Sequence, residues 1–323
     1  MAERCCLACL HTLSNIKTHK KNEKKHFFLA AMILILGILP SCSKDEFSLD
    51  ALQTANNAIS RASKSDQALD SLMVAIDKYN AAFIGGNRNA ALQSMLLASN
   101  SNTQRGFWGI LKKICKVVIA DAAGTSGGVI VGTASSIVAI IDQFGLDPAN
   151  AKSLTLPTTC PFLSSRETGS IKGEAHNKVA YQVIKNNPNF AKMNEVNLYN
   201  AVVLEYQKLY DKTSLPSFAF ASNLLNNVRT HLLENELNDE ASWYIAWQQI
   251  TQNQPKISKL VVDFALNVVN IRENDDVRSY VKGYSKIVEN SKVSTAEKSI
   301  IFDGISVAAN SRILWNASLS NME

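Results

Sequence analysis

Apolar residues recur at the spacing of an α-helix over most of this sequence, and this pattern limits the fold more than any other feature. Leu260, Phe264 and Val268, for example, follow one another at intervals of four. Residues three or four apart share one face of a helix, whereas residues on one face of a strand are two apart. Alternating β-branched runs joined by hairpin turns are lacking in the sequence. The sequence therefore predicts an all-α protein built as a helical bundle.

The helices expected in the C-terminal part are separated by clear breaks. Pro188, Pro216 and Pro255 interrupt the pattern, because proline lacks the backbone N–H that continues a helix. Ser294 and Glu297 match a capping box, which marks a helix start. The C-terminal bundle is expected over 173–323, with helices at 174–186, 194–211, 217–236, 239–252, 256–273, 275–290 and 295–319.

The chain before this bundle divides into further parts. Two helices are expected between residues 48 and 83, with a break at Ser65-Asp66 because both residues favour the N-cap position, and a short helix near 90–98. Further on, a proline-containing stretch has no sustained periodicity, which is typical of a linker at a domain boundary. The parts are an N-terminal tether with helices (42–104), an apolar glycine-rich segment (105–146) and a linker loop (147–172).

Small side chains recur every four residues within the apolar segment. On a helix this spacing forms a stripe that lets a second backbone approach closely. The stripe resembles the glycine-zipper segments of membrane-active bacterial proteins. Two alternatives follow: a helix or helical hairpin buried in the fold, or a segment, 107–141, that enters membranes or self-associates. The stripe consists of Ala120, Gly124, Gly128, Gly132 and Ser136.

The charge balance gives no reason to expect a nucleic-acid partner. The 323-residue chain carries 33 Lys and Arg residues against 28 Asp and Glu residues. Six of the basic and two of the acidic residues precede Cys42, which leaves 27 against 26 in the rest. A nearly neutral protein lacks the basic surface that binds phosphate backbones.

Motifs for catalysis, cofactors and metals are lacking in the sequence. It contains no G-x-S-x-G elbow, no phosphate-binding loop and no H-E-x-x-H pair. Glu174 and His176 are two positions apart, and such residues do not face each other on a helix. We therefore expect a non-enzymatic protein without a cofactor or metal, in which His176 caps a helix start. A hydrolase that uses Glu174 and His176 is the minor alternative.

Two cysteines, Cys115 and Cys160, follow Cys42 in the sequence. Cysteines in an oxidising compartment can form a disulfide. The sequence does not decide whether Cys115 and Cys160 meet, so both a disulfide and two free thiols stay open at this point.

A cationic and then apolar leader opens the chain. Four lysines between residues 20 and 25 precede the apolar run Phe27–Leu39. A charged region followed by an apolar run of this length is typical of an export signal. The run is too short to cross a bilayer as a helix, which takes about 20 residues. We predict that residues 1–41 are a signal peptide.

The leader ends in Leu39-Pro40-Ser41-Cys42, which resembles the lipobox of bacterial lipoproteins at Leu39, Ser41 and Cys42. The resemblance implies that a diacylglycerol group is attached to the Cys42 sulfur, that signal peptidase II cleaves before this residue, and that its new amino group is acylated, for example with palmitate. Several acyl chains anchor a protein stably, whereas a single chain gives marginal binding.

The residues after Cys42 resemble the signal that exports lipoproteins to the outer face of the outer membrane in one group of Gram-negative bacteria. The resemblance implies an outer-membrane protein that is anchored by lipid and faces the cell exterior. The tetrad consists of Ser43, Lys44, Asp45 and Glu46.

Three short motifs resemble a group of exported helical proteins from the same kind of bacteria. The resemblance implies no particular activity. The favoured interpretation is a binding or interaction protein of the cell envelope with an unidentified protein or envelope ligand as its partner. The alternative is a membrane-active or bacterial competition protein that inserts or oligomerises through 107–141. The motifs are Gly173-Glu174-x-His176-Asn177, Lys112-Lys113 with Ala120-Asp121-x-x-Gly124, and Ile305-Ser306-Val307-Ala308 with Ser311 and Trp315.

Overall fold

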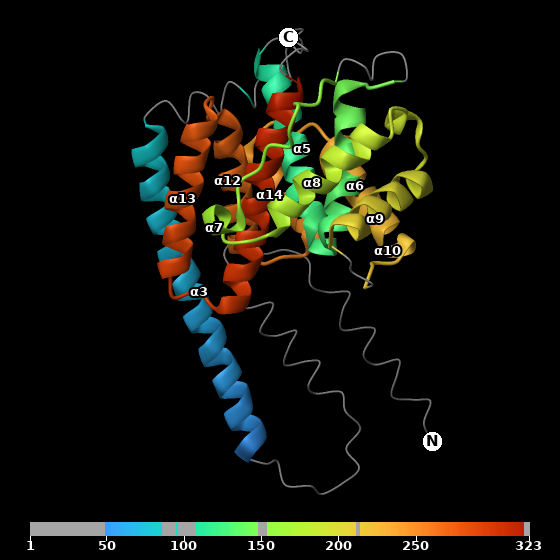
Figure 1. The fold of residues 1–323 in the computed structure, drawn as a ribbon. Helices are drawn as coiled ribbons and strands as arrows, with labels where there is room; N and C mark the ends of the chain where they lie inside the picture. Colours follow the sequence, from blue (N-terminus) through green and yellow to red (C-terminus); the bar gives the residue numbers. More distant parts are fainter. Residues whose placement is uncertain (1–48, 86–94, 96–106, 148–153, 211–213, 320–323) are drawn as a thin grey trace, which may run out of the picture. The chain divides into compact units, whose positions relative to one another are not determined.

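The computed structural model describes most of the chain after the leader. The residues described are 49–85, 95, 107–147, 154–210 and 214–319. The expected signal peptide, Cys42, the tetrad 43–46 and most of the short helix near 90–98 lie outside them. Within the described residues every regular element is a helix and no strand occurs (Figure 1), which confirms the all-α prediction.

Contacts group the chain into two units, residues 1–56 and residues 57–323. The second unit contains the C-terminal bundle and also the apolar segment that the sequence analysis placed in a separate part. Its helices after residue 164 are α7 (Ser165–Thr168), α8 (Lys172–Asn186), α9 (Glu195–Tyr210), α10 (Phe218–Val228), α11 (Glu240–Thr251), α12 (Pro255–Asn270), α13 (Asn274–Asn290) and α14 (Thr295–Leu319).

These bounds match the expected helices closely, with one difference in the third. There α10 ends at Val228 and a π-helical turn, η5 (Arg229–Leu233), continues the chain. The start of α14 is the expected capping box: the Glu297 N–H donates to Ser294 Oγ at 3.3 Å, and the Ser294 N–H donates to Glu297 Oε2 at 3.1 Å.

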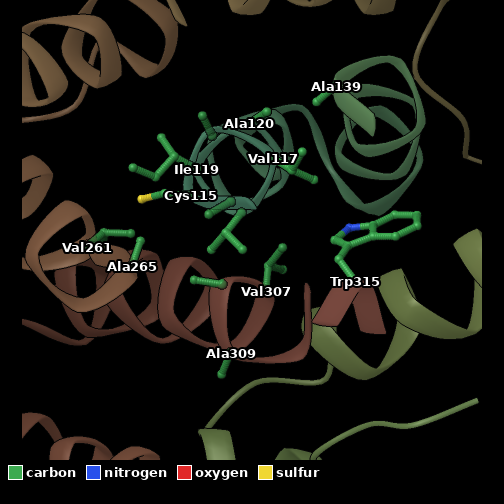
Figure 2. Packing of buried hydrophobic residues seen from close by; sticks show 14 of the residues in the cluster. Cys115, Val117, Ile119, Ala120, Ala139, Val261, Ala265, Val307, Ala309 and Trp315 are labelled. Atoms are coloured by element: carbon green, nitrogen blue, oxygen red, sulfur yellow. The ribbon is translucent and has the colours of Figure 1, made fainter. Parts of the chain in front are cut away.

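Helix α14 lies at the centre of the bundle and packs against α5 (Phe107–Gly124), α8, α12 and α13 (Figure 1). Every residue from Gly304 to Trp315 is buried. Figure 2 shows α5 and α14 packed together, with Val307 among the apolar side chains between them and Trp315 directed towards the neighbouring helix α6 (Val129–Phe144). A helix buried around its whole circumference requires partners for every polar side chain that it carries.

The glycine-rich segment forms a helical hairpin rather than one continuous helix. Helices α5 and α6 are joined by a short 3₁₀ turn, η2 (Thr125–Gly127), and by Gly128, whose φ of 95° suits glycine. Gly124 and Gly132 meet across the hairpin, because a Cβ on Gly124 would lie 2.9 Å from Gly132 Cα. The expected stripe is therefore divided by the turn, and its small residues serve the close approach of two antiparallel helices.

The hairpin is packed inside the unit. Residues 114–125 and 130–140 are all buried, which favours the core-packing alternative for the segment 107–141. In the part of the chain that the structure describes, no helix combines the length and the apolar character needed to cross a bilayer.

Residues 154–171 pack along α14 instead of forming a free linker. Leu154 and Leu163 are buried. The Thr155 N–H donates to the Ser318 carbonyl at 3.2 Å, and the Leu163 N–H donates to Asn310 Oδ1 at 2.7 Å. The described part of the expected linker loop thus belongs to the same unit as α6 and α8.

Helix α3 (Leu49–Ile84) runs without the expected break at Ser65-Asp66. Both side chains are engaged by other helices instead of capping a helix start. Ser65 Oγ donates to Glu297 Oε1 at 2.5 Å, and the Asp66 carboxylate lies 3.4 Å from Lys256 Nζ. Tertiary contacts therefore outweigh the local preference of these residues for an N-cap.

The hairpin packing predicts that Gly132→Ala lowers the free energy of unfolding. The new Cβ would lie 2.5 Å from Thr125 Cγ2 and 3.2 Å from the Asp121 carbonyl oxygen. We expect a loss of about 1–3 kcal/mol from this overpacking, which exceeds the gain in helix propensity of about 1 kcal/mol. Urea unfolding followed by circular dichroism measures the change.

A second substitution makes this test specific. Thr125→Ser removes the obstructing Cγ2 but keeps the hydroxyl that donates to the Ala122 carbonyl at 2.6 Å. The double variant should be more stable than the sum of the two single effects by at least about 0.5 kcal/mol. Additive effects would contradict the close contact between Gly132 and Thr125.

Candidate functional site

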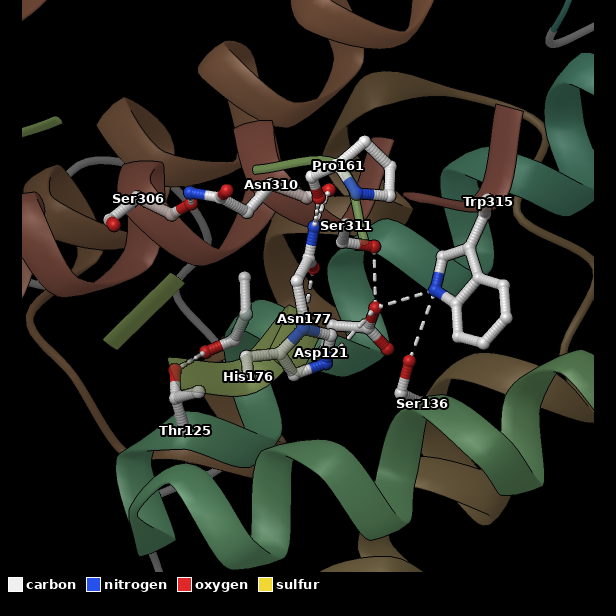
Figure 3. Close-up of polar contacts among 11 residues, drawn as sticks. Asp121, Thr125, Ser136, Pro161, His176, Asn177, Ser306, Asn310, Ser311 and Trp315 are labelled. Carbon is white, nitrogen blue, oxygen red and sulfur yellow. Dashed lines mark hydrogen bonds and ion pairs between the residues drawn. The ribbon is translucent and has the colours of Figure 1, made fainter. Parts of the chain in front are cut away.

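Four helices bring polar side chains together beneath the surface. Asp121 comes from α5, Ser136 from α6, His176 from α8, and Ser311 and Trp315 from α14, and we call these residues the buried polar cluster (Figure 3). All five are 0 % exposed. The cluster includes residues from each of the three short motifs that carried the resemblance to exported helical proteins. The spacing of these motifs along the sequence does not indicate that they meet.

Close helix packing brings the cluster together. Ser311 and Trp315 are four residues apart and therefore lie on one face of α14. The start of α8 approaches α14 so closely that a Cβ on Gly173 would lie 2.2 Å from the Ser306 carbonyl oxygen. Only glycine fits there, and this contact places His176, one turn further along α8, in the interior.

Asp121 is the acceptor at the centre of the cluster. Its Oδ2 accepts hydrogen bonds from Ser311 Oγ at 2.5 Å and from Trp315 Nε1 at 3.1 Å, and the same indole N–H lies 3.1 Å from Ser136 Oγ. Burial raises the pKa of Asp121, although His176 and the hydrogen bonds act in the opposite direction. The rise in the pKa caused by desolvation of the carboxylate is therefore larger than the decrease caused by His176 and the hydrogen bonds.

His176 has one ring nitrogen whose proton can be assigned from its neighbours. Both protons of Asn177 Nδ2 are used, because it donates to the carbonyls of Pro161 and Asn310 at 2.8 Å each. The Asn177 Oδ1 thus faces the ring and accepts from His176 Nδ1 at 3.1 Å. The remaining nitrogen, Nε2, lies 3.5 Å from Asp121 Oδ2.

The contact between His176 Nε2 and the Asp121 carboxylate is favourable only if a proton lies between the two atoms. A bare nitrogen and a carboxylate oxygen would direct lone pairs at each other, so the contact is favourable only when one of the two groups carries a proton. The separation of 3.5 Å satisfies an ion pair, but Nε2 has no hydrogen-bond partner among the described residues, and neither has Asp121 Oδ1. A buried polar atom without a partner costs about 1–3 kcal/mol.

A second, better satisfied network lies beside the cluster on the same helix. Ser306 Oγ accepts from the Gly173 N–H at 3.2 Å and donates to the Thr168 hydroxyl at 2.9 Å. Asn310 accepts from the Leu163 N–H and donates to the Ser306 carbonyl at 2.9 Å. These bonds attach the segment before α8 to α14, and they hold the frame in which Asp121 and His176 meet.

The cluster contains the residue types of a catalytic triad in a different arrangement. In a triad the serine donates to the histidine, which in turn donates to the carboxylate. Here Ser311 donates directly to Asp121, and His176 contacts Asp121 from another direction. The geometry therefore joins four helices through one acceptor and does not prepare a nucleophile.

Other residues singled out by the sequence analysis lie apart from this cluster. Glu174 forms an ion pair with Lys178 at 2.6 Å, so it does not turn towards His176. His176 is buried and contacts side chains, instead of the expected capping of a helix start. Gly128 is in the hairpin turn and Ala120 is buried in α5.

The structure contains no disulfide between Cys115 and Cys160, and both are free thiols. Cys115 is buried within α5, and burial raises its pKa. Cys160 is half-buried in the segment before α8, and burial raises its pKa to about 11. Both thiols are therefore held in the protonated, less reactive form at neutral pH.

Within the described residues, no group of three or more His, Cys, Asp and Glu side chains is arranged to hold a metal ion. Comparison with protein families, curated proteins and solved structures found no match to the chain.

The raised pKa of Asp121 predicts how pH affects stability. A carboxyl group whose folded-state pKa is raised contributes stability below its unfolded-state pKa, and this contribution is lost as the pH rises through the folded-state pKa. Asp121→Asn removes that dependence. The free energy of unfolding of the variant minus that of the wild type should therefore increase between pH 4 and pH 7, by about 1.4 kcal/mol for each unit by which the pKa is raised.

Urea unfolding at several pH values measures this difference. A difference that falls as the pH rises would show that His176 and the other donors keep the Asp121 carboxylate charged more effectively than burial opposes it. That result would contradict the raised pKa.

Proposed function

We propose that this chain is a lipid-anchored protein of the bacterial cell envelope whose helical body binds a partner without catalysis. The observation that best supports the proposal is the lipobox-like sequence Leu39 to Cys42 behind a cationic and apolar leader. The first described helix begins at Leu49. An anchor on Cys42 would therefore stand directly before the folded part of the chain.

The burial of the polar cluster favours a binding role over catalysis. A catalytic acid, base or nucleophile has to come within hydrogen-bond reach of its substrate. Asp121, His176 and Ser311 are 0 % exposed and engage one another. The side chains that could serve as a catalytic acid, base or nucleophile thus hold helices together. A partner would therefore bind to the outer surface.

The expected surroundings of the protein follow from the residues next to Cys42. The tetrad Ser43 to Glu46 supports transport to the outer face of the outer membrane. Acyl chains on Cys42 would contact the membrane, and the helical body would face an envelope ligand or another protein outside the cell.

Membrane insertion or self-association through residues 107–141 is the alternative function. It would require the hairpin to leave the core, because Gly124 and Gly132 already pack against each other and the surrounding side chains are buried. The apolar surface that such opening exposes costs about 25 cal/mol per Å² in water. This cost favours the binding role.

The anchor predicts that Cys42→Ala abolishes lipid attachment and processing by signal peptidase II. The variant should keep its leader and therefore have a larger mass, and it should carry no acyl chains in intact-mass spectrometry of the isolated protein. Cys160→Ala is the matched control, because it removes a cysteine of the folded body and should leave processing unchanged. Normal processing and normal acylation of Cys42→Ala would contradict the anchor.

Dye release from liposomes tests the alternative function. The chain from Ser43 onward should cause no leakage at temperatures at which circular dichroism shows it folded, because the hairpin is then buried. Gly132→Ala should lower the melting temperature without creating leakage below it. Leakage caused by the folded wild type would contradict the core-packing interpretation and favour membrane insertion.

A further inference from the structure

A half-open groove of about 820 Å³ lies between α3 and the C-terminal end of α13. Its volume is within the range of about 300–1,000 Å³ that is usual for small-molecule sites. All of its residues belong to the unit 57–323. The groove is lined by Lys64, Gln67, Ala68, Ser71, Leu72, Ala75, Ile287, Asn290, Ser291 and Lys292.

Two contacts of α3 with neighbouring helices lie near the ends of the groove. At one place the Tyr79 ring stacks on Tyr280 with centroids 5.6 Å apart, and its hydroxyl donates to the Tyr280 carbonyl at 3.0 Å. At the other place Ser65 donates to Glu297. Between these contacts Leu69 and Ile76 are buried in the core, whereas the shorter side chains of Ala68 and Ala75 line the groove, and α13 lies beside α3 (Figure 1).

The floor of the groove is apolar and elongated. Ala68, Leu72 and Ala75 are spaced by four and three residues and share one face of α3, and Ile287 lines the side formed by α13. From Lys64 to Ala75 the groove follows α3 for about 16 Å, at about 1.5 Å per residue. This shape suits a flexible hydrocarbon chain laid along the helix.

The charges at the groove are cations without partners. Lys64 and Lys292 are exposed, and neither forms an ion pair among the described residues. The nearby acids of α3, Asp66 and Asp70, form ion pairs with Lys256, whose Nζ lies 3.4 and 2.7 Å from their carboxylate oxygens. The lining residues include no Asp or Glu, so the two charged side chains that line the groove are both cationic.

The carbonyl end of α13 also faces this region and would repel an anion. Two of its carbonyls are already bonded, however. The Val288 carbonyl accepts from Ser291 Oγ at 2.7 Å, and the Glu289 carbonyl accepts from Lys298 Nζ at 2.6 Å. These donors offset the negative end of the helix, and the two lysines remain available.

We propose that this groove binds a fatty acid, with its hydrocarbon chain along Ala68, Leu72 and Ala75 and its carboxylate between Lys64 and Lys292. The apolar floor and the unmatched cations together select a single-chain anionic amphiphile. The proposal does not depend on the anchor at Cys42.

Titration calorimetry of the full chain with dodecanoate, and with dodecanol as its uncharged analogue, tests the proposal. Dodecanoate should bind about 2- to 30-fold more tightly than dodecanol, because two exposed ion pairs contribute about 0.2–1 kcal/mol each. Shortening the chain should weaken binding by up to about fourfold for each CH₂ removed. The double variant Lys64→Gln/Lys292→Gln should remove the preference for the carboxylate. Lys78→Gln, on α3 outside the groove, is the matched control and should leave binding unchanged.

A second pair of variants tests the hydrocarbon part. Ala75→Leu fills the groove and should abolish binding, whereas Ala81→Leu adds the same side chain to α3 outside the lining residues and should not. Melting temperatures confirm that the variants are folded. Equal binding of dodecanoate and dodecanol, or binding unaffected by Ala75→Leu, would overturn the proposal.

A further result would also overturn it and identify a different occupant. Binding of a lysophospholipid with no binding of dodecanoate would assign the groove to a phosphate headgroup.

Discussion

Helix α14 passes through the middle of the bundle, and the rest of the structure depends on finding partners for its polar side chains. Ser306, Asn310, Ser311 and Arg312 are all buried on this one helix. Ser306 and Asn310 both contact the segment before α8, whereas Ser311 and Arg312 contact other parts of the chain, so together they fix several segments against α14. Ser311 fixes the hairpin through Asp121, and Asn310 fixes the segment before α8. Apolar packing alone would tolerate sliding between these helices, whereas such hydrogen bonds define one register.

Buried cations join helix ends by the same principle. Arg312 donates to the carbonyls of Ile271 and Arg272 just after α12, and Lys116 donates to the carbonyls of Leu233 and Asn235 at 2.9 Å each. Carbonyls at a helix end lack partners within the helix and attract cations. Burial nevertheless lowers the pKa of Lys116 to about 8 and that of Arg312 to about 10. The Lys116 contacts therefore weaken if the solution pH rises through about 8, whereas the guanidinium of Arg312 stays charged.

Most helices could be predicted from the sequence, because apolar periodicity, prolines and a capping box are local signals. The errors arose where distant residues decide the outcome. Ser65 favours a helix start locally but donates to Glu297, which is far away in sequence. The same limit applies to the polar cluster. Asp121, His176 and Ser311 lie in separate motifs, and no spacing rule within one helix indicates that α5, α8 and α14 bring them to a single point.

The interior of this bundle therefore positions the helices, whereas its surface is available for binding. The polar cluster is sealed, and its contacts hold α14 to the hairpin and to α8. Helix α3 is held by the buried side chains of Leu69, Leu72 and Ile76, and also by the aromatic contact at Tyr79 and the hydrogen bond of Ser65 near the two ends of the groove. A ligand in that groove would contact both α3 and α13 and would stabilise their association by mass action. A ligand in the groove can thus stabilise the association of α3 with α13 without changing the core that positions α13.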